Sequence, residues 1–191
     1  KHVRERFSID LRNPFHANKI TFMNISSHVL TEAKSYPVAT MICQCLASII
    51  VGFECVLKAS PHFYVDTTGA AFTYPIFRVI SRPCRIIAYV HYPIISSDML
   101  AMVREQRPDY NNSESITKST TISTAKLAYY SVIARIYGYV GRYATTILVN
   151  SSWTKDHISG LWREDCKLVY PPCNTAMMQA IPLEGREKAA K

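Results

Sequence analysis

The 191-residue sequence lacks the short motifs that mark several common enzyme classes. It contains no G-x-G-x-x-G, no P-loop, no G-x-S-x-G and no H-E-x-x-H. These absences exclude dinucleotide-binding, ATPase, α/β-hydrolase and zinc-protease sites in their usual forms. Internal repeats and coiled-coil heptads are also missing. A function must therefore rest on a less general arrangement of residues.

The six cysteines lack the spacing of a metal site. None forms a C-x-x-C pair, and none has the histidine pattern that is typical of zinc ligation. Several lie in strongly apolar stretches. This setting favours buried free thiols in a reducing compartment over disulfides.

Acidic residues are scarce relative to basic ones, with 14 Asp and Glu against 22 Lys and Arg and a formal net charge of +8. The excess favours an anionic partner, such as phosphate groups, nucleic acid or an acidic membrane leaflet. The basic residues are dispersed and do not gather with exposed aromatics, so nucleic acid is not expected as a partner. At 48% hydrophobic and 19% charged, the composition is that of a globular domain.

One apolar run, residues 36–57, approaches the length of a membrane span. Gln44 and Glu54 interrupt it, and a helix that packs on a parallel sheet needs similar apolarity. We therefore expect a buried helix over 38–57, with a membrane span as the alternative.

Strands and helices are expected to alternate along the chain. Helices are predicted by periodicity and caps, and strands by short apolar runs bounded by turn residues. Strict alternation predicts parallel βαβ units in a three-layer α/β sandwich. Ser97 is the expected cap of one helix, and the polar stretch 106–124 is expected to be a flexible loop. The expected strands are 7–11, 20–25, 63–69, 85–90, 145–151 and 167–170, and the further helices are 74–81, 98–104, 125–143 and 153–162.

His91 is the leading candidate for a functional residue. Residues 85–90 predict a buried strand, and Pro93 cannot continue a central ladder. Ligands of open α/β sheets bind beyond the carboxyl ends of the strands, which leaves His91 and Tyr92 at the mouth of a cleft. A strand-terminal imidazole can bind a sugar hydroxyl or a phosphate, although a structural role is equally consistent with this position.

Other polar residues are candidates for the same cleft. Ser96 and Asp98 lie one turn further on, but Asp98 is equally suited to offset the dipole of the helix that follows. Asp66 is interpreted mainly as a turn and cap residue, and Asn150 as part of a cap that would also suit an anion. His157 is expected on a solvent-facing side of its helix.

The predicted helix 125–143 combines five tyrosines with basic residues. This composition is typical of a helix at a membrane interface, although most of the tyrosines are expected in the core. The basic residues that would face a membrane are Lys126, Arg135 and Arg142.

Three stretches together carry a family resemblance. YVHYPIISSDML at 89–100, KLAYYSVIARIYGYVG at 126–141 and LVNSSWTKDHISGLW with VYPPC within 148–173 resemble the α-1,2-mannosyltransferases of the dolichol-linked oligosaccharide pathway. The resemblance implies a retaining glycosyltransferase of the GT-B fold, with residues 1–170 as part of its Rossmann-like, acceptor-side N-terminal domain. Residues 171–191 would begin a linker to a nucleotide-sugar domain outside this chain.

The family transfers mannose from GDP-mannose to a dolichol-pyrophosphate-linked oligosaccharide on the cytosolic face of the endoplasmic reticulum membrane, during assembly of the N-glycan precursor. The resemblance thus implies GDP-mannose and the dolichol-linked glycan as substrates, the endoplasmic reticulum membrane surface as a partner, and sibling mannosyltransferases of the pathway as further partners. It implies no metal and no cofactor besides the donor. Without the donor domain, this chain alone is expected to be inactive.

By resemblance, His91 takes the place of the histidine that many retaining GT-B enzymes hold against the transferred sugar. Tyr92, Ser96 and Asp98 would contact the acceptor glycan. The leaving diphosphate is usually held to take the acceptor proton in such enzymes, so paired carboxylates are not required. The alternatives are a non-catalytic membrane-binding or scaffolding domain, and a related GT-B transferase with another donor.

Overall fold

The computed structural model describes residues 10, 12–13, 19–105, 120–163, 165–173 and 179. Apart from Asp10, the predicted strand 7–11 lies outside the described residues. So do positions 106–119 of the predicted loop and most of the predicted linker 171–191.

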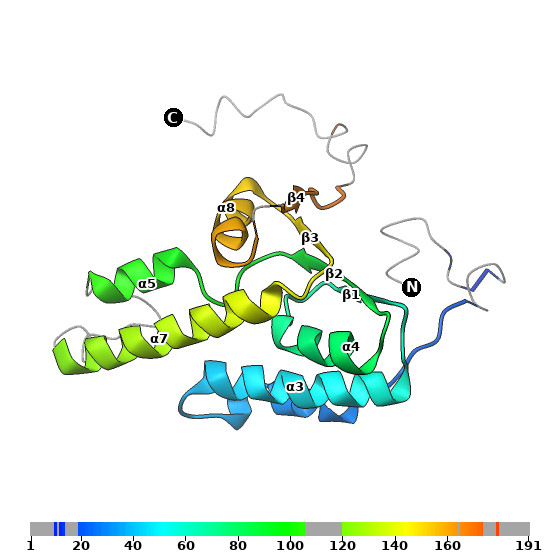
Figure 1. Ribbon diagram of the computed structural model, residues 1–191, viewed down its shortest axis with the longest axis horizontal. Coiled ribbons are helices and arrows are strands. Elements are labelled where there is room, and N and C mark those ends of the chain that lie inside the picture. Colours follow the sequence, from blue (N-terminus) through cyan, green and yellow to red (C-terminus); the bar gives the residue numbers. More distant parts are fainter. Residues whose placement is uncertain are drawn as a thin grey trace.

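A parallel sheet of four strands forms the centre of the fold (Figure 1). The strands lie in the order β1-β2-β3-β4, with Val65 paired to Ile87 and Ala88 to Ile147. Parallel neighbours joined by helices confirm the predicted Rossmann-like α/β fold. The strands are β1 (Phe63–Asp66), β2 (Arg85–Val90), β3 (Thr146–Val149) and β4 (Lys167–Leu168).

The predicted helices are all present, and one is longer than expected. The helix expected to begin at 125 begins at Thr120, so 120–124 of the predicted loop are helical; no proline or glycine interrupts this stretch. The α-helices are α3 (Thr40–Lys58), α4 (Tyr74–Ile80), α5 (Ser97–Arg104), α7 (Thr120–Gly141) and α8 (Ser152–Leu161), and the 3₁₀ helices are η1 (Ser26–Thr31), η2 (Ala33–Ser35) and η3 (Ala71–Thr73).

The prediction of a strand at 20–25 is wrong. This segment is exposed for most of its length, forms no strand and leads into η1, which lies along α3. Side chains of α3 satisfy its backbone: Lys58 Nζ donates to the Asn24 carbonyl (2.7 Å), and Glu54 accepts from the Ser26 amide (2.9 Å). These contacts replace the ladder that a strand would need.

The described helices pack on one face of the sheet. Ile86, Ala88 and Val90 point into the core, while the alternate side chains of β1 leave Phe63 and Val65 59% and 57% exposed. Successive right-handed crossovers in one direction place the helices on the same side, where Figure 1 shows α3, α4 and α7 together. The third layer of the predicted sandwich is therefore not present among the described residues.

Helix α7 approaches the end of α8 closely because two glycines permit it. A Cβ at Gly138 would lie 2.7 Å from the Leu161 carbonyl oxygen, and one at Gly141 would lie 2.2 Å from the Trp162 ring. Trp162 is buried and packs edge-on against Tyr137, with 5.1 Å between the ring centroids. This contact joins the C-terminal end of α7 to the C-terminal end of α8.

Helix α3 is only partly buried, which corrects the prediction of a buried helix. Cys45, Gly52 and Val56 face the core, whereas Leu46 and Leu57 are exposed. By length and composition α3 is also apolar enough to cross a membrane, a test that core helices of soluble proteins pass as well.

Candidate functional site

Polar segments that follow β1, β2 and β3 meet at the carboxyl edge of the sheet, as predicted. These segments are residues 66–69, 91–92 and 150–154. The backbone N–H of Asn150 donates to the Val90 carbonyl (3.3 Å), and this bond joins the ends of β3 and β2. This is the edge at which ligands of parallel α/β sheets bind.

Asp66 shapes the turn after β1. Its Oδ1 accepts from the amide and the hydroxyl of Thr68 (2.8 and 2.7 Å), and its Oδ2 accepts from the Tyr74 hydroxyl (2.6 Å). Burial, together with the charge of Asp66, raises the pKa of Tyr74, so this phenol stays protonated and donating. Gly69 adopts a φ of 78° and places the turn beside the Tyr92 carbonyl. The turn interpretation is confirmed.

Thr154 connects the ends of β2 and β3 to the start of α8. Its side chain is buried, and its amide donates to Ser151 Oγ (3.1 Å), which caps α8. Its hydroxyl lies 3.0 Å from the His91 carbonyl and 2.9 Å from Asn150 Oδ1, and it can donate to either. The cap predicted at this position is therefore present, and it also fixes the backbone of His91.

The His91 side chain is exposed at this edge. Its ring packs edge-on against Tyr89, with 4.7 Å between centroids, and the Tyr89 hydroxyl is anchored on the Val169 carbonyl (2.9 Å). Within residues 19–105 and 120–163, no hydrogen bond engages the ring nitrogens of His91. A supported imidazole with two unoccupied nitrogens can bind a hydroxyl or a phosphate oxygen.

An aromatic pair flanks His91. Tyr92 stacks on Trp153 with 5.0 Å between centroids and 22° between planes, and both rings are exposed. The Trp153 and His157 rings are in contact, with 4.0 Å between their centroids. His157 Nε2 lies 3.4 Å from Asp98 Oδ2. The series ties the starts of α5 and α8 together and presents flat, amphipathic rings to solvent.

Ser96 has a structural contact. It is buried, and its Oγ accepts from the Met99 amide (3.2 Å). Ser96, and not Ser97 as predicted, therefore caps α5 with its side chain, because Ser97 is already the first residue of that helix. The cap holds the Ser96 hydroxyl below the surface, away from an acceptor glycan.

Two residues of the aromatic series differ from the predictions. The solvent-facing position predicted for His157 is wrong, since its side chain is 9% exposed and Nδ1 donates to the Trp153 carbonyl (2.8 Å). Trp153 was not predicted as a site residue. Its position just after the capping serines was the available signal, because the start of α8 faces the carboxyl edge. Asp98, in contrast, is exposed near the edge as predicted.

A groove runs from this edge toward α3 and α7. One hollow of about 420 Å³ lies between α3 and the turn at Thr68, and a second of about 430 Å³ extends to Tyr129. The two adjoin, since Met41, Gln44 and Ile94 line both. The groove is mainly apolar, with hydroxyls at the end next to the sheet.

The three basic residues predicted to face a membrane differ in their surroundings. Lys126 lies over the Tyr130 ring, 5.6 Å from its centroid. Arg142 Nε donates to the Trp162 carbonyl (3.1 Å), and Arg135 is exposed. That these residues face a membrane stays a prediction.

No group of His, Cys, Asp and Glu among the described residues has the geometry to hold a metal ion. The six cysteines are free thiols; Cys45, Cys84 and Cys166 are buried, as predicted, whereas Cys43 and Cys55 are half-buried and Cys173 is exposed. Burial raises the pKa of Cys45 to about 11, so its thiol is a poor nucleophile at neutral pH.

The parallel sheet with a polar carboxyl edge defines a Rossmann-like α/β domain. A family profile described as "ALG11 mannosyltransferase N-terminus" matches residues 1–162, and the chain belongs to this family. No solved structure matches the chain.

The curated relatives bear the name GDP-Man:Man(3)GlcNAc(2)-PP-Dol alpha-1,2-mannosyltransferase. The chain is 40% identical to the Mus musculus protein over 95% of its length, 42% identical to the Xenopus tropicalis protein over 93%, and 31% identical to the Yarrowia lipolytica protein over 98%. It spans 36%, 36% and 28% of those relatives. The chain therefore corresponds to about a third of their length.

Proposed function

We propose that this chain is the acceptor-side domain of an α-1,2-mannosyltransferase. The enzyme would transfer mannose from GDP-mannose to a dolichol-pyrophosphate-linked oligosaccharide, at the cytosolic face of the endoplasmic reticulum, in N-glycan precursor assembly. The observation that carries the proposal is the imidazole of His91 at the carboxyl edge, supported by Tyr89 and without a hydrogen bond to the described residues, in a chain whose relatives bear the name of this activity. Residues 171–191 would lead to the nucleotide-sugar domain.

His91 would contact the donor at the cleft between the two domains. Its ring nitrogens are suited to hydrogen-bond a mannose hydroxyl or a diphosphate oxygen, and the bond from Thr154 fixes its backbone. A hydrogen-bonding group that faces charge developing in the transition state accelerates the reaction most when the protein already holds it in position. His91 is therefore the catalytic residue that we assign to this half of the site.

Of the described carboxylates at the edge, Asp66 is buried and accepts from Thr68 and Tyr74, and we assign the exposed Asp98, 3.4 Å from His157 Nε2, to the acceptor glycan. We therefore assign the role of base to the leaving group. The acceptor 2-hydroxyl oxygen would bond to the mannose C1 as the bond from C1 to the diphosphate oxygen breaks. The hydroxyl proton would pass to that departing oxygen, which leaves GDP and an acceptor one mannose longer, with configuration retained.

The acceptor would lie along the aromatic pair and the groove. Tyr92 and Trp153 offer exposed flat faces to a sugar ring, and Asp98 is near enough to bind hydroxyls. The apolar groove beyond Thr68 leads toward α3, which suits the lipid side of the acceptor. Sibling mannosyltransferases of the pathway are proposed as further partners.

A non-catalytic membrane-binding or scaffolding domain is the second candidate. The exposed apolar residues of α3 favour it, because they offer a surface for attachment without any chemistry. A related transferase with another sugar donor is the third.

His91→Ala in the longer enzyme that contains this domain tests the proposal. We expect transfer of labelled mannose from GDP-mannose to the lipid-linked acceptor to fall by about a hundredfold or more at equal expression. His62→Ala is the matched control, because His62 is also exposed but precedes β1 at the opposite end of the sheet. Unchanged transfer by His91→Ala would remove the catalytic role and favour the attachment domain.

A further inference from the structure

Helix α3 carries an exposed apolar stripe. Leu46, Ile50, Phe53 and Leu57 are between 43% and 82% exposed. Their spacing of four, three and four residues places them on one face of the helix. Such a stripe on a helix that already packs on a core indicates contact with a further apolar phase.

The other faces of α3 are occupied, which fixes the direction of the stripe. Gly52 lies against Thr73, where an added Cβ would be 3.3 Å from the Thr73 Cβ. On another side, Glu54 accepts from the Ser27 amide (2.8 Å) and pairs with Lys58 (2.6 Å). These contacts pack α3 lengthwise against the rest of the domain. Only the apolar stripe of the helix is therefore exposed, and not its whole surface.

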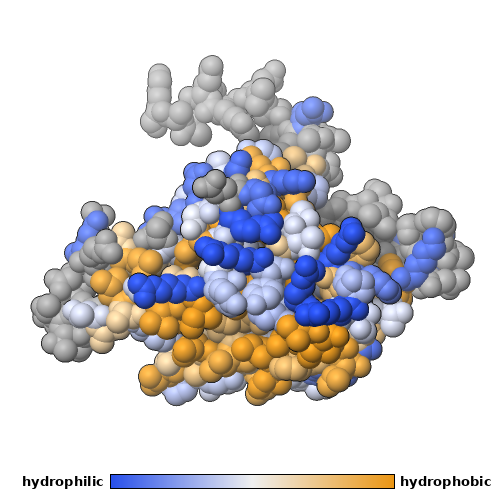
Figure 2. Space-filling model, viewed as in Figure 1, coloured by the Kyte–Doolittle hydropathy of each residue, from blue (hydrophilic) through white to orange (hydrophobic). Residues whose placement is uncertain are grey.

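Helix α7 carries a second stripe with the same spacing. Val132, Ile136 and Tyr139 are between 41% and 62% exposed. Val79 and Ile80 of α4 add exposed apolar area. Figure 2 shows an extended hydrophobic area along the lower part of the view, where α3 lies in Figure 1. We call the exposed apolar residues of α3, α4 and α7 the helical face.

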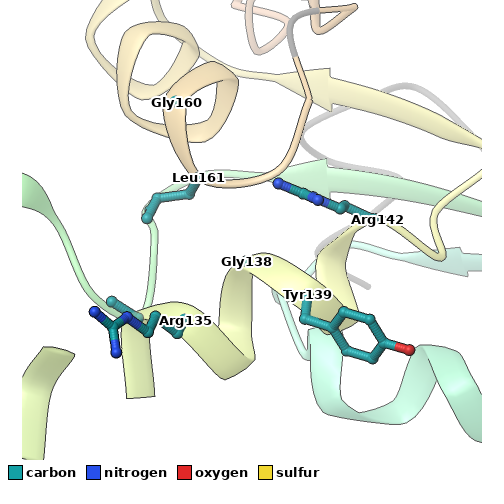
Figure 3. A pocket seen from close by; sticks show the side chains of 7 residues that line it. Arg135, Gly138, Tyr139, Arg142, Gly160 and Leu161 are labelled. Carbon is teal, nitrogen blue, oxygen red and sulfur yellow. The ribbon is translucent and has the colours of Figure 1, made fainter. Parts of the chain in front are cut away.

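Arginines border this helical face. Arg135 and Arg142 flank a hollow of about 320 Å³ between α7 and α8, and Figure 3 shows their guanidinium groups on opposite sides of it, with the Tyr139 ring pointing away from α8. Arg78 and Arg82 line a second hollow beside α4. In the described part of the chain, no carboxylate lies within ion-pair distance of Arg135 or Arg142. Figure 2 shows hydrophilic side chains directly above the hydrophobic area.

We propose that the helical face docks in the plane of an anionic phospholipid leaflet. The stripes of α3 and α7 enter the boundary between headgroups and acyl chains, and a lipid phosphate sits between Arg135 and Arg142. The charge pattern favours a bilayer over a protein partner, because arginines that form no ion pair with a described carboxylate rim an extended apolar area. The inference rests on the membrane location proposed above and is independent of the sugar chemistry.

The docked orientation differs from the one predicted from helix 125–143 alone. Helix α3 supplies the longest stripe, and Lys126 is already placed over Tyr130. Met41 and Gln44 lie across α3 from the stripe, so the groove runs along the core side of this helix toward the carboxyl edge.

Vesicle flotation of the 191-residue chain tests the inference. Vesicles of phosphatidylcholine with phosphatidylserine should carry the unaltered chain upward. The Ile50→Glu and Leu57→Glu double variant should lower the partition coefficient by at least about tenfold, since two side chains leave the apolar phase. The matched control is Phe63→Glu with Val65→Glu, since these residues are 59% and 57% exposed and lie on the face of the sheet that no described helix covers. Circular dichroism confirms the fold of each variant.

The arginine rim has its own arm of the test. Arg135→Gln should reduce flotation by about fivefold with anionic vesicles and leave it unchanged with phosphatidylcholine alone. Arg85→Gln is the control, because Arg85 is exposed on the bare sheet face. Undiminished flotation of the α3 double variant, or failure of the unaltered chain to float, overturns the inference. Unchanged mannose transfer by His91→Ala in the longer enzyme, with normal flotation of the unaltered chain, overturns only the proposed function.

Discussion

The carboxyl edge of the sheet and the helical face expose side chains in opposite ways. At the edge, loop residues are held by hydrogen bonds from buried groups, as Thr154 holds the His91 backbone, and the His91 imidazole has no hydrogen bond to the described residues. On the helical face, helix periodicity alone brings Ile50 and Leu57 to the surface without polar contacts. The first arrangement fixes the position of one group, as chemistry requires. The second fixes only a direction, which is sufficient for attachment.

Breaking the close contact between α7 and the end of α8 should have the largest effect on stability. In Gly141→Ala the new Cβ would lie 2.2 Å from the Trp162 ring, so α7 and α8 must separate. We expect a loss of about 1–3 kcal/mol of stability, or more, from this overpacking. Guanidinium unfolding measures it. Gly160→Ala is the control, because nothing lies within 4 Å of that Cβ and the Tm should not fall. Equal Tm values for both variants would contradict the packing described here.

The Thr154→Val substitution should change the carboxyl edge of the sheet and leave the helical face unchanged. The substitution keeps the volume but removes the hydroxyl next to the His91 carbonyl and Asn150 Oδ1, which should cost about 1–3 kcal/mol. Thr154 is a positioning residue, so kcat should fall while flotation stays normal, and Thr154→Ser should restore kcat. A Ser variant as slow as the Val variant would show that the hydroxyl does not position His91.

Two tyrosines of similar exposure separate the regions most clearly. Tyr92 at the edge is 58% exposed, and Tyr139 on the helical face is 62% exposed. Tyr92→Ala removes a stacking partner worth about 0.5–1.5 kcal/mol, so the KM for the acceptor glycan should rise up to about tenfold. Tyr139→Ala should weaken flotation and leave the KM for a lipid-free acceptor unchanged. The same changes in KM and in flotation for both variants would contradict separate roles for the carboxyl edge and the helical face.

The smallest effect concerns the η1 contact that orients α3. Hydrogen bonds from Lys58, Ser27 and Ser26 hold the pKa of Glu54 well below its usual range. The lowered folded-state pKa means that Glu54 stabilises above the ordinary value of 4.5, and that this contribution is lost as the pH falls further. Glu54→Gln should lower the Tm slightly at pH 7, with the difference shrinking below pH 4.5. A difference that is constant with pH would contradict this role.

Local patterns predicted most of the fold. Strand β2 was predicted in full because an apolar run ends before His91 and Pro93. The segment 20–25 was mispredicted because its alternating residues favour a strand, while its actual partners are the side chains of Glu54 and Lys58, far along the chain. Capping of α5 by Ser96 was missed by a single residue.

The site was predicted only where it follows directly from strand ends. His91 and Tyr92 were expected at the carboxyl edge, and they lie there. The contacts of Trp153 with His157 and of His157 with Asp98 depend on α8 lying beside the start of α5, which no local pattern encodes. The exposed stripe of α3 was hidden in the sequence because a buried helix and an interfacial helix have similar composition.

The most direct test compares two variants of the longer enzyme on two acceptors. Mannose transfer by His91→Ala and by the Ile50→Glu and Leu57→Glu variant is measured with the dolichol-linked acceptor in vesicles and with a short-chain acceptor in solution. We predict that His91→Ala is slow on both acceptors, and that the α3 variant is slow only in vesicles. Normal transfer by His91→Ala, or the same loss on both acceptors for the α3 variant, would contradict the assignment of chemistry to the edge and attachment to the helical face.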